Sequence, residues 1–112
     1  GSVMERRSCP RVQASHPVLC FTDFYPRPKH ASTLDLSLGG TRIETPHTLT
    51  TGESLELTIA IRPQSITCRG KAIHVTAPEN GSVKAGIRFE NLSEYDRLYL
   101  RQYLSQITEQ PR

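Results

Sequence analysis

The chain has 112 residues, the size of one domain, and 36% of them are hydrophobic and 22% charged, which excludes disordered and fibrous classes. No stretch approaches the roughly 20 apolar residues that a membrane helix needs, and no signal peptide is visible. Three cysteines without C-x-x-C spacing fit a reducing compartment, so we expect a cytoplasmic protein. The net charge of +3 and the pI of about 9.0 favour an anionic partner.

The N-terminal residues are expected to form an arm rather than part of the core. Residues 1–4 are interpreted as a remnant of an expression tag with a flexible N-terminus, and residues 5–15 as the arm itself. Three arginines, Arg6, Arg7 and Arg11, fall within the first eleven residues of the chain, and the proline at position 10 disfavours a helix there. Arginine binds phosphate, or the O6/N7 edge of guanine, through two parallel hydrogen bonds, so this arm is a candidate anion-binding segment.

Strand signals dominate the middle of the chain, from residue 16 to residue 91. Apolar and polar residues alternate there with a period of two, which is typical of strands that have one buried face. In one of these strands the alternation places Asp35 and Ser37 on the solvent-facing side. The predicted strands lie at about 16–25, 33–38, 55–61, 65–76 and 83–89.

Glycines mark the places where this alternation changes phase. The apolar face moves from even-numbered to odd-numbered positions across Gly39-Gly40, and again across Gly70. Such a one-residue slip predicts a β-bulge or a sharp bend, which helps an antiparallel sheet to close into a barrel. Turns are predicted at 26–29, 51–52, 62–64 and 78–81.

The last element is predicted to be an amphipathic helix over residues 93–108. Ser93 is suited to be its N-cap, with Asp96 three residues later in the capping-box position. The apolar side chains follow the i, i+3, i+4, i+7 pattern of a helix that packs against a core. They are Leu100, Tyr103, Leu104 and Ile107, with Leu98 and Tyr99 widening the stripe.

The reactive side chains do not form a catalytic pattern. Cys9, Cys20 and Cys68 are odd in number and lack C-x-x-C spacing, which argues against a disulfide framework or a zinc site. The four histidines have no metal-binding spacing, and neither a nucleophile elbow nor a P-loop is present. We therefore predict a protein that is not an enzyme, has no cofactor or bound metal, and does not turn over its ligand.

A second candidate binding segment is Asp35-Leu36-Ser37-Leu38-Gly39-Gly40. Its carboxylate can accept hydrogen bonds from the N1–H and N2–H₂ groups of guanine, and its serine can bond a base or a phosphate. Gly40 permits a close approach of the backbone and a bend. Taken alone, this segment fits equally well with the end of a strand followed by a diglycine bulge.

Together, the R-x-x-x-R of Arg7 and Arg11 and the D-x-S-x-x-G of residues 35–40 resemble the PilZ family. The similarity extends over residues 5–108, through ESLELTIAI, ITCRGKAIHV, AGIRF and LSEYDRLYLRQYL. It implies an all-β fold, a six-stranded antiparallel barrel with a C-terminal helix, in a bacterial receptor for cyclic di-GMP. The ligand is often bound by the family as an intercalated dimer.

The resemblance also implies a role for each motif residue. Arg7 and Arg11, with Arg6 as an auxiliary, would hold phosphates and guanine as the arm becomes ordered on binding, and the signal would pass to an unidentified protein effector. Asp35 and Ser37 would read a guanine, with Gly40 at the bend. Secondary positions at the same surface are Gly39, Gly86 and Arg88.

Two other functions remain open from the sequence. A small basic β-barrel can bind single-stranded nucleic acid, although 6% aromatic residues and no tryptophan leave few groups for base stacking. A degenerate PilZ domain that contacts only protein partners is the second alternative. The intact motif residues argue against it.

Overall fold

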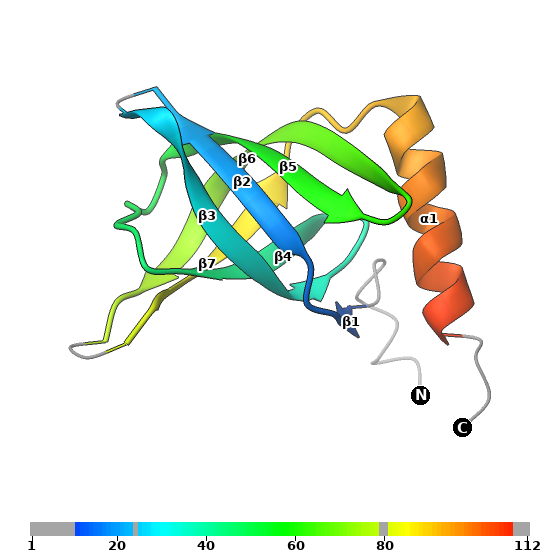
Figure 1. The fold of residues 1–112 in the computed structure, drawn as a ribbon, viewed down its shortest axis with the longest axis horizontal. Helices are drawn as coiled ribbons and strands as arrows, with labels where there is room; N and C mark the ends of the chain where they lie inside the picture. Colours follow the sequence, from blue (N-terminus) through cyan, green and yellow to red (C-terminus); the bar gives the residue numbers. More distant parts are fainter. Residues whose placement is uncertain (1–10, 24, 79–80, 109–112) are drawn as a thin grey trace.

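A computed structural model describes residues 11–23, 25–78 and 81–108, and it consists mostly of antiparallel strands with one helix in the described residues (Figure 1). The elements are β1 (Val12–Gln13), β2 (Pro17–Thr22), β3 (Tyr25–Leu36), β4 (Gly40–Thr45), β5 (Ser54–Ile61), β6 (Gln64–Thr76), β7 (Val83–Phe89) and α1 (Glu94–Thr108).

Six of the strands close into a barrel, which confirms the predicted fold class. The hydrogen-bonded order is β3-β2-β5-β6-β7-β4, and a further pairing of β4 with β3 closes the circle. The extra strand β1 continues along the edge of β3 that β2 occupies, with Val12 opposite Leu36 and Gln13 opposite Asp35. The C-terminal end of the predicted arm is therefore part of the sheet, and its Val12 side chain is buried.

The core lies inside the barrel and is built from the alternating apolar faces. Leu55, Leu57, Ile59 and Ile61 of β5 are all 0% exposed, as their period-two spacing predicts. Burying each such side chain stabilises the fold by about 1.5–3 kcal/mol. Because these six strands are paired all round, the part of the barrel that the structure describes has no long unpaired edge.

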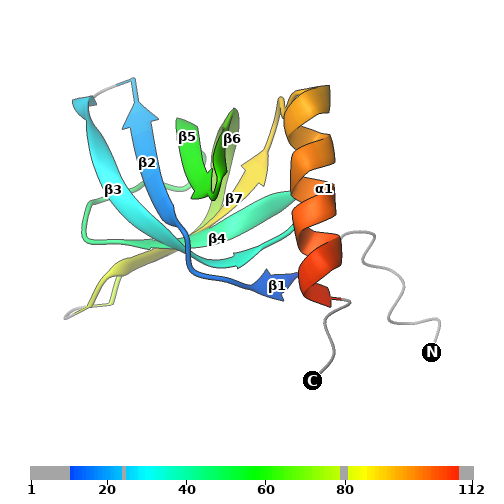
Figure 2. The same cartoon turned by 45° about the vertical axis from the view of Figure 1, so that its right-hand side comes forward.

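Helix α1 lies across one end of the barrel, beside β1 (Figure 2). Its N-cap is confirmed, because the Ser93 hydroxyl accepts a hydrogen bond from the Asp96 N–H at 3.1 Å. Leu100 and Leu104 are buried against the barrel, whereas Leu98 is 51% exposed and does not belong to the packed stripe. Among the described residues, no helix combines the length and apolar character needed to span a membrane.

The predicted turn at residues 26–29 is wrong, because these residues lie within β3. The chain reverses earlier, between Thr22 and Tyr25, which pair directly with each other. Between the pairs Cys20–Lys29 and Thr22–Tyr25, β3 contains two more residues than β2, so the ladder is irregular there. Proline lacks an N–H to donate, and this irregularity accommodates both prolines of the segment.

The predicted slip at Gly70 is also displaced in the structure. Gly70 and Ala72 continue the buried face of β6, and the register shift comes between Ala72 and His74, so that Ile73 is the bulged residue. Gly70 has a different role: an added Cβ would lie 2.7 Å from Ile87 Cγ2, so glycine is needed there for close packing of neighbouring strands.

Candidate functional site

The two motifs that are separated in sequence meet on the outside of the barrel. Arg11, the first described residue, donates a hydrogen bond from Nη1 to Asp35 Oδ1 at 2.6 Å. The same carboxylate oxygen accepts the backbone N–H of Arg42 at 3.2 Å. Both of these hydrogen bonds use Oδ1 of Asp35, and Oδ2 accepts no hydrogen bond from the described residues.

Ser37 does not face solvent, contrary to the prediction from alternation. It lies after the end of β3, is 3% exposed, and its hydroxyl donates to the Gly40 carbonyl while accepting the N–H groups of Gly39 and Gly40, each at 3.2 Å. The backbone also turns here, since the Ser37 N–H donates to the Gly40 carbonyl at 2.9 Å. This hydroxyl therefore holds the tight turn between β3 and β4, which aims Asp35 and Arg42 outward together.

Gly40 is required by packing as well as by the turn. An added Cβ would lie 2.2 Å from the carbonyl oxygen of Ile87 in the neighbouring strand β7. No side chain fits at that distance, so β4 and β7 approach as closely as they do only because this residue is glycine.

Thr33 of β3 is buried, because the ladder with β4 shifts register between Thr33 and Asp35 and places Thr33 opposite Ile43, on the inward face of the sheet. Its hydroxyl accepts the His16 N–H at 2.9 Å and donates to the Ala14 carbonyl. The His16 ring in turn hydrogen-bonds the Tyr103 hydroxyl of α1, with Nε2 and Oη 2.8 Å apart. Burial lowers the pKa of His16, and a hydrogen bond with the Ala60 backbone acts in the opposite direction. The end of the arm is thus tied to both the barrel and the helix.

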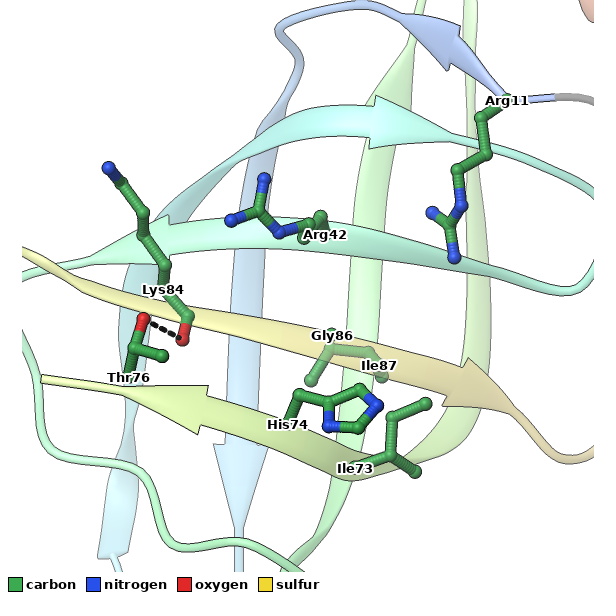
Figure 3. A pocket seen from close by; sticks show the side chains of 8 residues that line it. All are labelled: Arg11, Arg42, Ile73, His74, Thr76, Lys84, Gly86 and Ile87. Carbon is green, nitrogen blue, oxygen red and sulfur yellow. Dashed lines mark hydrogen bonds between the residues drawn. The ribbon is translucent and has the colours of Figure 1, made fainter.

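A pocket of about 130 Å³ lies on the outer surface of β4, β6 and β7, with Arg11 at its edge (Figure 3). Its centre is a row of cross-strand partners, in which Arg42 pairs with Gly86 and Gly86 pairs with His74. This row begins at Asp35, the partner of Arg42 on β3. The residues that line the pocket are Arg11, Arg42, Ile73, His74, Thr76, Lys84, Gly86 and Ile87.

The pocket carries more positive than negative side chains. Arg11, Arg42 and Lys84 line it, and no carboxylate does. Of these three cations, only Arg11 forms an ion pair with another described residue. An unpaired arginine and lysine beside a concave surface form an electrostatic environment that suits a phosphate.

A model of the PilZ domain matches residues 5–106 of the chain. The chain belongs to the PilZ domain family. PilZ domains are ligand-binding regulatory domains rather than enzymes. A search of curated protein sequences found no match.

Solved structures share the PilZ fold at low sequence identity. The inhibitor of motility MotI/DgrA of Bacillus subtilis superimposes with a TM-score of 0.80 at 19% identity, covering 96% of this chain and 54% of its own. The PilZ domain of Escherichia coli YcgR, solved with c-di-GMP, superimposes with a TM-score of 0.75 at 16% identity, covering 93% of this chain and 92% of its own. MrkH, a c-di-GMP-dependent transcription regulatory factor, superimposes with a TM-score of 0.73 at 18% identity, covering 95% of this chain and 53% of its own. This chain therefore spans about half the length of MotI/DgrA and MrkH.

The structure brings only some of the predicted PilZ site residues together. Arg11, Asp35 and Gly86 lie around one surface, whereas Gly39 and Arg88 are exposed and do not line the pocket. Arg6 and Arg7 lie outside the described residues, so their placement stays a prediction. The ligand contacts assigned to Ser37 and Gly40 stay predictions as well.

Sequence reasoning missed the pocket residues Arg42, Ile73, His74 and Thr76, and Lys84 also lines the pocket. Each of these residues except Ile73 is at an outward position of its strand, which was the available signal. Alternation does not reveal which outward residues of different strands lie opposite one another, and that pairing creates the pocket.

The cysteines and histidines show no catalytic arrangement within the described residues. Cys20 and Cys68 are buried, and desolvation raises the pKa of each thiol to about 11, so they remain protonated at neutral pH. In the same residues, no three His, Cys, Asp or Glu side chains are grouped closely enough to hold a metal ion.

Proposed function

We propose that this PilZ domain binds cyclic di-GMP on the outer surface where Arg11 and Asp35 meet, and that it acts as a receptor without catalysing a reaction. The observation that carries the proposal is the 2.6 Å contact between these two residues, which joins the two motifs at the edge of a positively charged pocket. The presence of c-di-GMP in the YcgR structures supports it.

The geometry suits the two chemical groups of this ligand. Asp35 is oriented by bonds to Oδ1 only, so Oδ2 remains an acceptor for the N1–H and N2–H₂ edge of guanine. The Arg11 guanidinium has further N–H groups beyond Nη1 that are directed to neither Asp35 nor another described residue. These groups provide a bidentate partner for a phosphodiester.

We expect cyclic di-GMP to bind with a dissociation constant in the nanomolar to low-micromolar range, roughly −8 to −12 kcal/mol. Isothermal titration calorimetry on the full chain measures affinity and stoichiometry together, and a stoichiometry of two would support an intercalated dimer. Cyclic di-AMP is the matched control, because it carries the same phosphodiesters but lacks the guanine donors that Asp35 would read. It should bind much more weakly.

Other results would contradict the proposal. No heat and no chemical-shift change at high cyclic di-GMP concentration would refute it. Equal affinity for an oligothymidylate of matched charge would favour the single-stranded nucleic-acid alternative. If cyclic di-GMP is hydrolysed to a linear dinucleotide in proportion to protein concentration, even after repurification of the protein, the chain is an enzyme instead.

We also propose that the first part of the arm, residues 5–11, becomes ordered when the ligand binds, and that the arm passes the signal to a protein effector. The support is the chain of contacts from the arm to α1: Thr33 holds the backbone of His16, and the His16 ring bonds Tyr103. A change at the arm therefore has a direct physical route to the helix surface.

Amide hydrogen exchange with and without saturating cyclic di-GMP tests this ordering. We expect slower exchange in residues 5–11 on binding, because Arg7 and Arg11 gain partners, and altered exchange in α1. An arm with equal protection in both states would refute the ordering while leaving binding intact.

A further inference from the structure

Helix α1 has one side toward the barrel and one side away from it (Figure 2), and the second side carries an apolar patch. Tyr95 is 66% exposed and Leu98 is 51% exposed, and they are the exposed large hydrophobic side chains among the described residues. Because they are three residues apart on a helix, they are neighbours on its surface. Leu100 and Leu104 are the residues of α1 that are buried against the barrel. Packing of the helix therefore does not account for Tyr95 and Leu98.

The patch lies on a part of α1 that side-chain contacts hold in place. The Tyr95 hydroxyl donates to Gln64 Oε1 at 3.3 Å, and the Tyr99 hydroxyl accepts the Gln64 N–H at 3.3 Å. One turn away, Asp96 Oδ2 accepts the backbone N–H of Thr67 at 3.3 Å. These bonds tie the first two turns of α1 to the start of β6. A partner that binds there meets a preformed surface, which lowers the entropy cost of association.

Positive charge flanks the patch. Arg97 and Arg101 are both exposed, lie four residues apart on α1, and form no ion pair with a described residue. Like charges at this spacing repel each other and destabilise a free helix. Glu94 is also exposed but pairs with neither arginine, and the Asp96 carboxylate is directed to β6. The outward face of α1 thus combines an apolar patch with an excess of positive charge.

We infer that this face, formed by Tyr95, Leu98, Arg97 and Arg101, is the docking surface for a protein partner that presents an acidic amphipathic helix. Such a helix, lying alongside α1, places apolar side chains on the patch and carboxylates beside the arginines, because both helices repeat every three to four residues. A second copy of this chain would bring the same excess of positive charge, which disfavours self-association. The inference rests on the proposed function in one respect, that this partner is the effector of the receptor.

The test is a chemical-shift titration of the ¹⁵N-labelled full chain with a synthetic helical peptide of about 20 residues, with leucines on one face and glutamates beside them. We expect shifts centred on α1 and a dissociation constant in the micromolar range. The same peptide with lysine in place of glutamate should bind at least about tenfold more weakly, because its charges repel Arg97 and Arg101.

Two variants and a matched control locate the contact. Leu98→Glu and Arg101→Glu should each weaken binding of the acidic peptide at least about tenfold. Both changes put a good helix former at an exposed position, so thermal unfolding should show an intact domain. The control, Arg27→Glu, reverses an exposed arginine near the β2–β3 turn, which lies away from α1 (Figure 1), and should bind within about twofold of the wild type.

The outcomes separate this inference from the proposed function. Equal affinity for the acidic and basic peptides, or shifts outside α1, would overturn the docking surface. Binding to phosphatidylglycerol vesicles but not to the acidic peptide would assign the face to a lipid surface, and a dimer in sedimentation that Leu98→Glu dissociates would assign it to a second copy. A chain that binds the peptide on α1 but not cyclic di-GMP would overturn the proposed function and leave the docking surface in place.

Discussion

Arg11→Ala is expected to weaken cyclic di-GMP binding by about 2 kcal/mol or more, which is at least about 30-fold, because it removes charge-assisted contacts to the ligand. The same change should alter the free energy of unfolding by less than about 1 kcal/mol. The Arg11 and Asp35 side chains are 42% and 17% exposed, and ion pairs at such exposure contribute little to stability. Calorimetry and thermal unfolding measure the two quantities on the same sample.

Asp35 provides the companion measurement. Asp35→Ala should reduce the preference for cyclic di-GMP over cyclic di-AMP, because only the guanine has donors for this carboxylate. The double variant with Arg11→Ala closes a thermodynamic cycle and measures the coupling of the two residues in ligand binding.

Affinity should also fall as salt rises, because the site is partly exposed and phosphate attraction is screened. Unchanged affinity in Arg11→Ala would remove this residue from the site.

Gly40→Ala is expected to destabilise the domain by about 3 kcal/mol or more, because its Cβ would lie 2.2 Å from the backbone oxygen of Ile87. Relief requires β4 and β7 to separate, and these strands are paired from Gly40 to Thr45. For a domain of this size, such a loss lowers the midpoint of thermal unfolding by roughly 10 °C. Differential scanning calorimetry or circular dichroism provides the measurement.

Gly86→Ala is the matched control for this prediction. The two glycines lie on neighbouring, paired strands, but a Cβ at Gly86 makes only ordinary contacts. The free energy of unfolding of Gly86→Ala should therefore lie within about 1 kcal/mol of the wild-type value. If Gly40→Ala has the same free energy of unfolding as the wild type and yet binds cyclic di-GMP more weakly, Gly40 acts on the ligand rather than on strand packing.

Local patterns were sufficient for the elements whose burial follows a single period. The alternation of 55–61 predicts β5 and its four buried side chains, and the spacing after Ser93 predicts α1 with its N-cap. These patterns are readable because each strand or helix has one face toward the barrel. The motif pair likewise points to Arg11 and Asp35, which lie in contact at 2.6 Å, and their contacts with a ligand stay a prediction.

Burial of polar residues depended on register and on turn geometry. Thr33 and Ser37 alternate in sequence with the same parity as Asp35, yet both are buried. The register shift between Thr33 and Asp35 places Thr33 opposite the buried Ile43, and Ser37 lies in its own turn. Alternation in the sequence does not show where a strand slips against its neighbour or where it turns. That is a property of the tertiary arrangement.

Cross-strand register determined which residues form the pocket. Arg42, Gly86 and His74 are far apart in sequence and form one row only because of how β4, β7 and β6 pair. The bulge at Ile73 likewise arises from the mismatch between two strands rather than from a residue in one of them. A one-residue shift in pairing would change every neighbour in the pocket, so residue types in a single strand cannot determine it. The sequence by itself thus determined the barrel, the helix and the motif residues, whereas only strand pairing determined the pocket beside them.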